Sequence, residues 1–68
     1  MAMEFVVQRL QVGDVIRVDL GDGDVEATVA RDIVRTETAV HVVLRVPGRD
    51  DVAREWAPGE MVTVVRGP

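Results

Sequence analysis

The segment Leu10–Val18, which reads Leu-Gln-Val-Gly-Asp-Val-Ile-Arg-Val, is echoed near the other end of the chain by Trp56–Val64, which reads Trp-Ala-Pro-Gly-Glu-Met-Val-Thr-Val. Each segment contains a large apolar residue, a glycine suited to the positive φ of a tight turn, an acid, and then a run rich in valine. Runs of this kind form β-strands. Two strand-opening corners at the two ends of a short chain predict a small closed β-structure.

Period-two alternation of apolar and polar residues runs through the rest of the chain, and valine, the commonest residue, favours strands. We expect five strands, at residues 15–20, 25–34, 39–46, 52–56 and 61–66. The connections between them are short and contain glycine, proline and aspartate. The chain is therefore expected to be all-β, with residues 1–68 folding as one small five-stranded SH3-like barrel.

Two places depart from this simple alternation. The segment Met3–Arg9 fits either an extra edge strand or one helical turn. Arg31 falls at a position whose side chain would point into the core, and burying an unpaired guanidinium is costly. We therefore expect a bulge or a sharp bend near Ala30–Asp32.

Composition excludes several classes of protein. There is no cysteine, so no disulfide or metal-binding thiolate is available. No apolar stretch is long enough to span a bilayer, and the N-terminus lacks the pattern of a signal peptide. We expect a soluble, cytoplasmic protein. All eight basic residues are arginines, a bias that looks like a high-GC genome, and the net charge of −4 disfavours nucleic acid as a partner.

Catalytic and metal-binding chemistry has little material in this chain. Serine and cysteine are absent, and the one histidine, His41, could meet a hydroxyl such as that of Thr63 only if both faced outward from their strands. A nucleophilic triad also needs an orienting acid. The acidic segment Gly21–Glu26 could attract calcium, but Asp-Gly is a strong hairpin signal and we interpret it as a turn. We expect no enzyme, no cofactor and no metal site.

The corner Leu10–Ile16, with the pattern Leu-x-Val-Gly-Asp-x-Ile, is similar to the opening of many small bacterial SH3-like barrels, including KOW and Tudor-type modules. The resemblance covers about ten residues and implies a module that binds peptides, proteins or nucleic acid and does not catalyse. Tudor-type ligand cages need several aromatic side chains, whereas this chain has only Phe5 and Trp56. RNA contact by KOW modules usually comes with basic loops, whereas the loops here are acidic.

The outward faces of the strands give a hint about partners. If the inward-facing valines fill the core, then Val15, Val43, Met61 and Val65 point outward, which is more apolar surface than a solvated barrel needs. Contiguous apolar patches on soluble proteins tend to mark interfaces. We expect a protein partner or a second copy in a two-fold dimer to cover this surface. Alternatively, the N-terminal segment folds back over it.

Trp56 is the largest side chain, and it is expected either to plug one end of the barrel or to anchor a partner with Arg45 or Arg54 beside it. The predicted partner-binding residues are therefore Trp56, Val43, Val65, Arg45 and Arg54. We expect a non-catalytic protein-interaction or self-assembly module. The alternative is a small nucleic-acid-binding barrel that uses Arg45, Arg54 and Arg66, which requires these side chains to converge away from the acidic loops.

Overall fold

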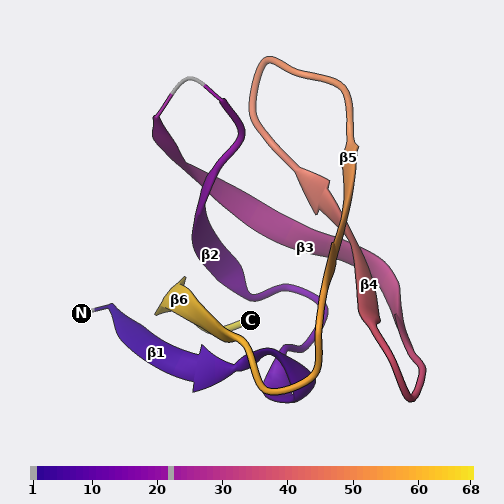
Figure 1. The fold of residues 1–68 in the computed structure, drawn as a ribbon. Coiled ribbons are helices and arrows are strands. Elements are labelled where there is room, and N and C mark those ends of the chain that lie inside the picture. The colour runs from indigo at the N-terminus through magenta and orange to yellow at the C-terminus, as the bar shows by residue number, and fades with distance from the viewer. Residues whose placement is uncertain (1, 22) are drawn as a thin grey trace.

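Alternating valines place one side of each expected strand in the core, and the strands follow that pattern. The computed structural model describes residues 2–21 and 23–68. In chain order the elements are β1 (Met3–Val6), the 3-10 turn η1 (Val7–Arg9), β2 (Val15–Asp19), β3 (Asp24–Arg35), β4 (Val40–Arg45), β5 (Val52–Trp56) and β6 (Met61–Arg66) (Figure 1). The five expected strands are all present, and their ends shift by one residue at most.

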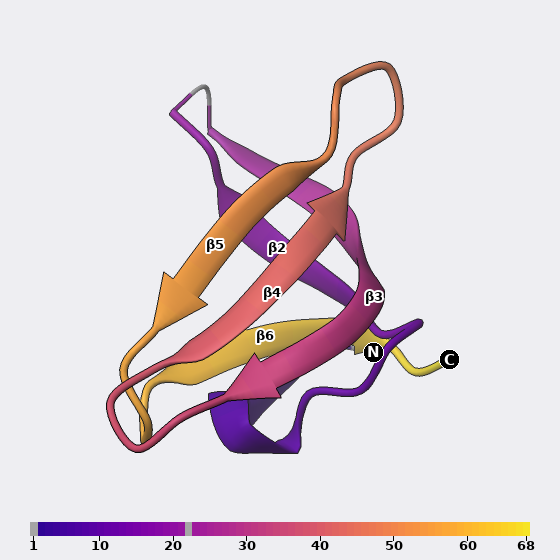
Figure 2. The same cartoon turned by 90° about the vertical axis from the view of Figure 1, so that its right-hand side faces the viewer.

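The strands form a single antiparallel sheet in the order β1-β6-β2-β3-β4-β5. The sheet curls into a half-barrel, which the two views in Figures 1 and 2 show from perpendicular directions. The prediction of a small, all-β, barrel-like domain is confirmed. The strand count rises from five to six because β1 is added beside β6, so β1 and β5 are the two edges of the sheet.

The N-terminal segment forms both structures that its sequence allowed, an edge strand followed by one turn of 3-10 helix. Residues 3–6 pair with β6, and the chain then makes the 3-10 turn. Val7 is fully buried in the core, and its N–H donates a hydrogen bond to the carbonyl oxygen of Glu60 at 2.8 Å. The N-terminal segment is therefore paired with β6 and contributes Val7 to the core. It does not lie across the outer face of β4.

β3 carries the bulge that the position of Arg31 predicts. Ala30 pairs with Val43 and Val34 pairs with His41, so three residues of β3 stand opposite a single residue of β4. Arg31 has a φ of 65° and is exposed to solvent. This left-handed backbone costs a non-glycine residue about 1 kcal/mol, which is less than burying an unpaired charge. The bend lets β3 follow the curl of the sheet (Figure 2).

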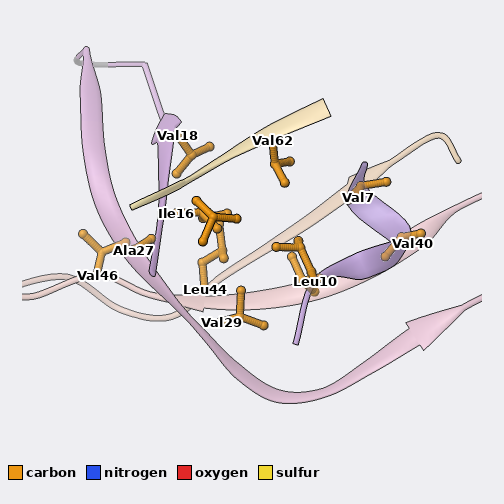
Figure 3. Close-up of a cluster of buried hydrophobic side chains, with 12 residues drawn as sticks. Val7, Leu10, Ile16, Val18, Ala27, Val29, Val40, Leu44, Val46 and Val62 are labelled. Carbon is orange, nitrogen blue, oxygen red and sulfur yellow. The ribbon is translucent and has the colours of Figure 1, made fainter. Parts of the chain in front are cut away.

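The core is a cluster of small aliphatic side chains that converge on the concave side of the sheet (Figure 3). Leu10, Ile16 and Leu44 are its largest fully buried members. The whole cluster comprises Val7, Leu10, Ile16, Val18, Ala27, Val29, Val40, Val42, Leu44, Val46, Val62 and Val64. Because this core is thin, partly buried residues at its rim, including Phe5 and Trp56, complete it.

The two corners identified in the sequence are real turns of the same kind. We call residues 10–14 the first corner and residues 56–60 the second corner. Gly13 and Gly59 have φ angles of 98° and 94°, a region that side chains other than glycine rarely adopt. Each corner delivers the chain into a strand that is paired on both sides, β2 after the first corner and β6 after the second.

Candidate functional site

Four of the five predicted partner-binding residues lie on one β-hairpin, which we call the β4–β5 ribbon. Val43 and Arg45 belong to β4, and Arg54 and Trp56 belong to β5. Val65 lies in β6, which is separated from β4 by two strands of the sheet. The structure therefore brings four of these residues onto one element and leaves Val65 elsewhere.

The ribbon presents its residues on two different faces. Arg54 stands opposite the core residue Val42, so its side chain shares the inner, concave face of the sheet. Arg45 stands opposite Thr28 of β3, and Val43 lies two residues earlier in β4, so both share the outer face. The predicted partner-binding residues of this hairpin are therefore divided between the two faces of the sheet.

Trp56 lies at the rim of the core with an arginine beside it. The side chain is half-buried and packs against the rim of the core. The guanidinium carbon of Arg54 lies 5.8 Å from the centroid of its ring, within the range of a cation–π contact. Arg54 Nη1 also donates a long hydrogen bond of 3.4 Å to the carbonyl oxygen of Asp19. The neighbouring arginine is therefore Arg54, which spans from β5 to the end of β2.

The three arginines of the alternative nucleic-acid patch do not gather. Arg45 lies on the outer face, where its Nε is 3.8 Å from Oδ1 of Asp51 in the acidic loop that follows β4. Arg54 lies on the inner face, and Arg66 stands opposite Val15 at the other side of the sheet. A shared electrostatic surface for phosphates would need these side chains to point in one direction.

A shallow depression opens on the outer face of the β4–β5 ribbon beside the bulge of β3. It has a volume of about 250 Å³. We call it the outer depression, and the outer-face residues that line it are Val34, His41, Val43, Ala53 and Glu55. Val43 pairs with Ala53, and His41 pairs with Glu55, so an apolar pair lies beside a polar pair. Such a surface offers a place for one apolar side chain with polar groups at its border.

Val65 lies in a different hollow, beside the N-terminal strand. That hollow has a volume of about 240 Å³ and is also bordered by Met3 and Phe5 of β1. Met61, at the start of β6, is half exposed on the outer face opposite Val6. The apolar residues expected on one continuous outer surface are thus split between the β4–β5 ribbon and the β1–β6 edge.

The prediction that Val15 forms part of an exposed outer patch is wrong. Its side chain is only 7% exposed. Val15 begins a central strand and stands between Thr28 of β3 and Arg66 of β6, at the point where the register between β2 and β6 shifts. Alternation within one strand predicts which face Val15 occupies but not that it is buried there.

β5 has a free edge. Among residues 2–21 and 23–68, its only paired neighbour is β4. Backbone groups on the open side of an edge strand form a ready template for another strand. The Trp56 ring and Arg54 border this edge on the inner face, while Ala53 and Glu55 border it on the outer face. The free edge of β5 is therefore flanked by an aromatic ring and a cation on the inner face, and by a small residue and an acid on the outer face.

His41 and Thr63 are not brought together. Thr63 lies in β6 opposite Arg17 of β2, and two strands separate β6 from β4. With neighbouring strands about 4.8 Å apart, the two residues are separated by about 14 Å or more along the sheet. They cannot share a proton as nucleophile and base.

The acidic loops also fail to form a recognisable cation site in the part of the chain that is described. No group of three or more histidine, aspartate or glutamate side chains is arranged there to hold a metal ion. Asp22, which belongs to the segment considered as a calcium loop, lies outside the described residues.

No helix among residues 2–21 and 23–68 has the length and apolar character needed to cross a lipid bilayer.

Comparison of the chain with protein-family models, with curated proteins and with solved structures finds no match. The function of this chain is therefore inferred from the geometry of the β4–β5 ribbon.

Sequence reasoning missed three residues of this ribbon and its surroundings, namely Ala53, Glu55 and Val34. Alternation within residues 52–56 indicates that Ala53 and Glu55 share a face, but it does not say which strand they meet. Their pairing with Val43 and His41 depends on the register that the 46–51 loop sets. Val34 reaches the outer depression because the bulge in β3 adds residues before it.

Proposed function

We propose that this domain is a non-catalytic protein-interaction module that receives an extended segment of a partner protein along the open edge of β5. The observation that carries the proposal is that β5 pairs with β4 alone in the described chain, while both faces beside its free edge carry groups suited to recognition. Addition of a strand to an exposed sheet edge is a recurring mode of peptide binding. In this mode the backbone supplies affinity and the alternate side chains supply specificity.

The side chains of the ribbon support this mode of binding. Tryptophan and arginine are the residue types most enriched among interface hot spots, and Trp56 and Arg54 lie in contact beside the edge. Ala53, on the opposite face, is small enough to leave the outer depression open. A bound strand would therefore meet an aromatic surface on one side and a shallow apolar hollow on the other.

The resemblance of the first corner to SH3-like modules supports the same class of function, because such modules usually bind peptides or proteins. The nucleic-acid alternative has less support, since Arg45 and Arg54 lie on opposite faces and Arg45 is already beside an acid. Net charge adds to this argument.

Affinity capture tests the proposal when it is combined with a substitution at the edge. The domain is immobilised and exposed to lysate of the source organism after nuclease treatment. Ala53→Lys fills the outer depression with a long charged side chain, and Val12→Lys makes the same change at an exposed apolar residue of the first corner. We expect a protein that the unaltered domain and Val12→Lys retain, and that Ala53→Lys retains about tenfold less well.

Hydrogen exchange on the complex then locates the contact. The captured protein should slow amide exchange at residues 52–56 and leave residues 10–14 unchanged. A partner that nuclease removes, or that Ala53→Lys retains in full, would overturn the proposal. Slowed exchange confined to β1 and β6 would move the site to the hollow around Val65.

A further inference from the structure

The charges along β5 bear on the identity of the strand that it accepts. β5 reads Val-Ala-Arg-Glu-Trp, with Arg54 directed to the inner face and Glu55 to the outer face. This inference rests on the proposed function. We infer that the β5 edge receives an antiparallel segment of a different protein. That segment has a basic residue opposite Glu55, an acidic residue opposite Arg54 and an apolar residue opposite Ala53. A second copy of this chain does not fit.

In a two-fold dimer formed through β5, the two copies of the strand pair antiparallel, and one residue at the symmetry axis lies opposite its own copy. Three such registers pair at least three strand residues of each copy. They place Ala53, Arg54 or Glu55 at the axis. Centring on Arg54 or on Glu55 puts that residue opposite itself, and centring on Ala53 puts Asp51 opposite Glu55. Like charges directly opposite each other destabilise a strand pair. Every extensive self-pairing of this edge is therefore opposed by charge.

A heterologous strand removes each of these conflicts. In an antiparallel partner, successive residues face Glu55, Arg54 and Ala53 in that order, so the favoured pattern from N- to C-terminus is basic, acidic, apolar. The antiparallel direction continues the pattern of the whole sheet and is slightly more stable than a parallel pairing. The apolar residue opposite Ala53 lies beside the outer depression, whose floor also contains Val43.

The preceding and following residues of the partner face Trp56 and Val52, which are half-buried on the inner face. Apolar or β-branched residues suit both positions because cross-strand pairs of this kind stabilise sheets. The complete favoured pattern is therefore apolar, basic, acidic, apolar, apolar. It contains one charge of each sign, so its order can be tested without changing composition.

Two blocked seven-residue peptides provide the test. The matched peptide reads Thr-Val-Lys-Glu-Val-Val-Thr, and the swapped peptide exchanges only its lysine and glutamate. Each is titrated to millimolar concentration into the isotope-labelled full chain, and backbone amide shifts are followed by NMR. We expect shifts at residues 52–56, with the matched peptide binding about tenfold more tightly than the swapped one. In Glu55→Lys, an exposed substitution, this preference should fall several-fold.

The outcomes separate this inference from the proposed function. Equal affinity of the two peptides at β5 would refute the charge pattern and leave the edge as a binding site. The absence of shifts at β5 with either peptide, or shifts confined to other strands, would overturn both. Shifts of β5 amides that depend on protein concentration alone would mean that a second copy occupies the edge, which also refutes the inference.

Discussion

The first corner, residues 10–14, and the second corner, residues 56–60, share a turn but differ in their surroundings. In each corner the acid accepts a hydrogen bond from the N–H three residues earlier. Asp14 Oδ2 accepts from Gln11 at 2.9 Å, and Glu60 Oε2 accepts from Ala57 at 2.6 Å. The N–H of each acid donates back to the carbonyl of that same residue, at 3.1 Å and 3.2 Å respectively. The two corners share only their glycine, but the same order of residue types forms the same hydrogen-bonded turn in both.

The first corner is enclosed by the fold. Leu10 is fully buried, and the Asp14 side chain is only 6% exposed. The Gly13 N–H donates to the carbonyl of Val29 at 2.8 Å, and the Val29 N–H donates to the carbonyl of Asp14 at 2.8 Å. These bonds fasten the corner to the backbone of β3, a central strand, so it serves the stability of the core.

The second corner is fastened more lightly. Trp56 is half-buried and Glu60 is exposed. This corner has one backbone bond to a neighbouring segment, from the Val7 N–H to the Glu60 carbonyl at 2.8 Å, and the Gly59 N–H donates to a side chain, Oε1 of Gln8, at 2.9 Å. The strand that leads into the second corner, β5, is an edge of the sheet, whereas the first corner follows the turn η1, which places Val7 in the core. Local sequence therefore specifies the turn, while the position in the sheet decides whether the leading apolar residue is enclosed by the core or lies at its rim.

The largest expected difference between the corners is at their leading apolar residues. Leu10→Ala should destabilise the domain by about 2–5 kcal/mol, because it empties a fully buried site. Trp56→Ala should cost about 1–2 kcal/mol, because part of the ring is already in water. Urea unfolding followed by circular dichroism measures both free energies of unfolding.

A domain of this size is marginally stable, so Leu10→Ala could unfold it entirely. Leu10→Val then provides the measurable comparison, with an expected loss of about 1 kcal/mol. A greater loss for Trp56→Ala than for Leu10→Ala would show that Trp56 belongs to the core and would weaken its assignment as an anchor for partners.

The next largest difference in stability between the corners is expected from replacing their glycines, Gly13 and Gly59. Alanine at either position must adopt a φ near 95°, and each substitution should cost about 1–2 kcal/mol for that reason alone. A Cβ at Gly13 would also lie 2.8 Å from Cβ of Pro68, whereas a Cβ at Gly59 would meet nothing within 4 Å. We expect Gly13→Ala to lose about 1 kcal/mol more than Gly59→Ala in thermal or urea unfolding.

Removing Pro68 supplies the control for this difference. In a chain that ends at Gly67, the two alanine substitutions should have equal cost, because only the strained φ remains. A gap that persists without Pro68 would mean that the first corner is held in place by something other than this contact.

Much of this fold could be predicted from the sequence because its information is local. The alternation of valines located five strands, and the wrong parity of Arg31 located the bulge in β3. The repeated corner pattern located two turns with glycine at positive φ. In each case the physical cause, a buried face or a backbone angle, acts within a few residues of its signal.

The site was harder to predict because it depends on register between strands. The alternative nucleic-acid patch required Arg45 and Arg54 to converge, yet the pairing of Val42 with Arg54 places them on opposite faces. Val15 is likewise buried at the position where the register between β2 and β6 shifts. Neither the register across a loop nor the identity of the open edge can be read from the alternation of one strand.

The smallest expected difference in stability between the corners comes from replacing their acids, Asp14 and Glu60. Asp14→Ala removes the acceptor for the Gln11 N–H in a nearly buried setting, so it should cost about 1–2 kcal/mol. Glu60→Ala frees the Ala57 N–H at an exposed site where water replaces the carboxylate, so it should cost about 0.5 kcal/mol. Asp14→Asn and Glu60→Gln retain an acceptor oxygen and should recover part of each loss. If Glu60→Ala proved as costly as Asp14→Ala, the second corner would be as enclosed in solution as the first, and the edge of β5 beside it would not be free to receive a partner.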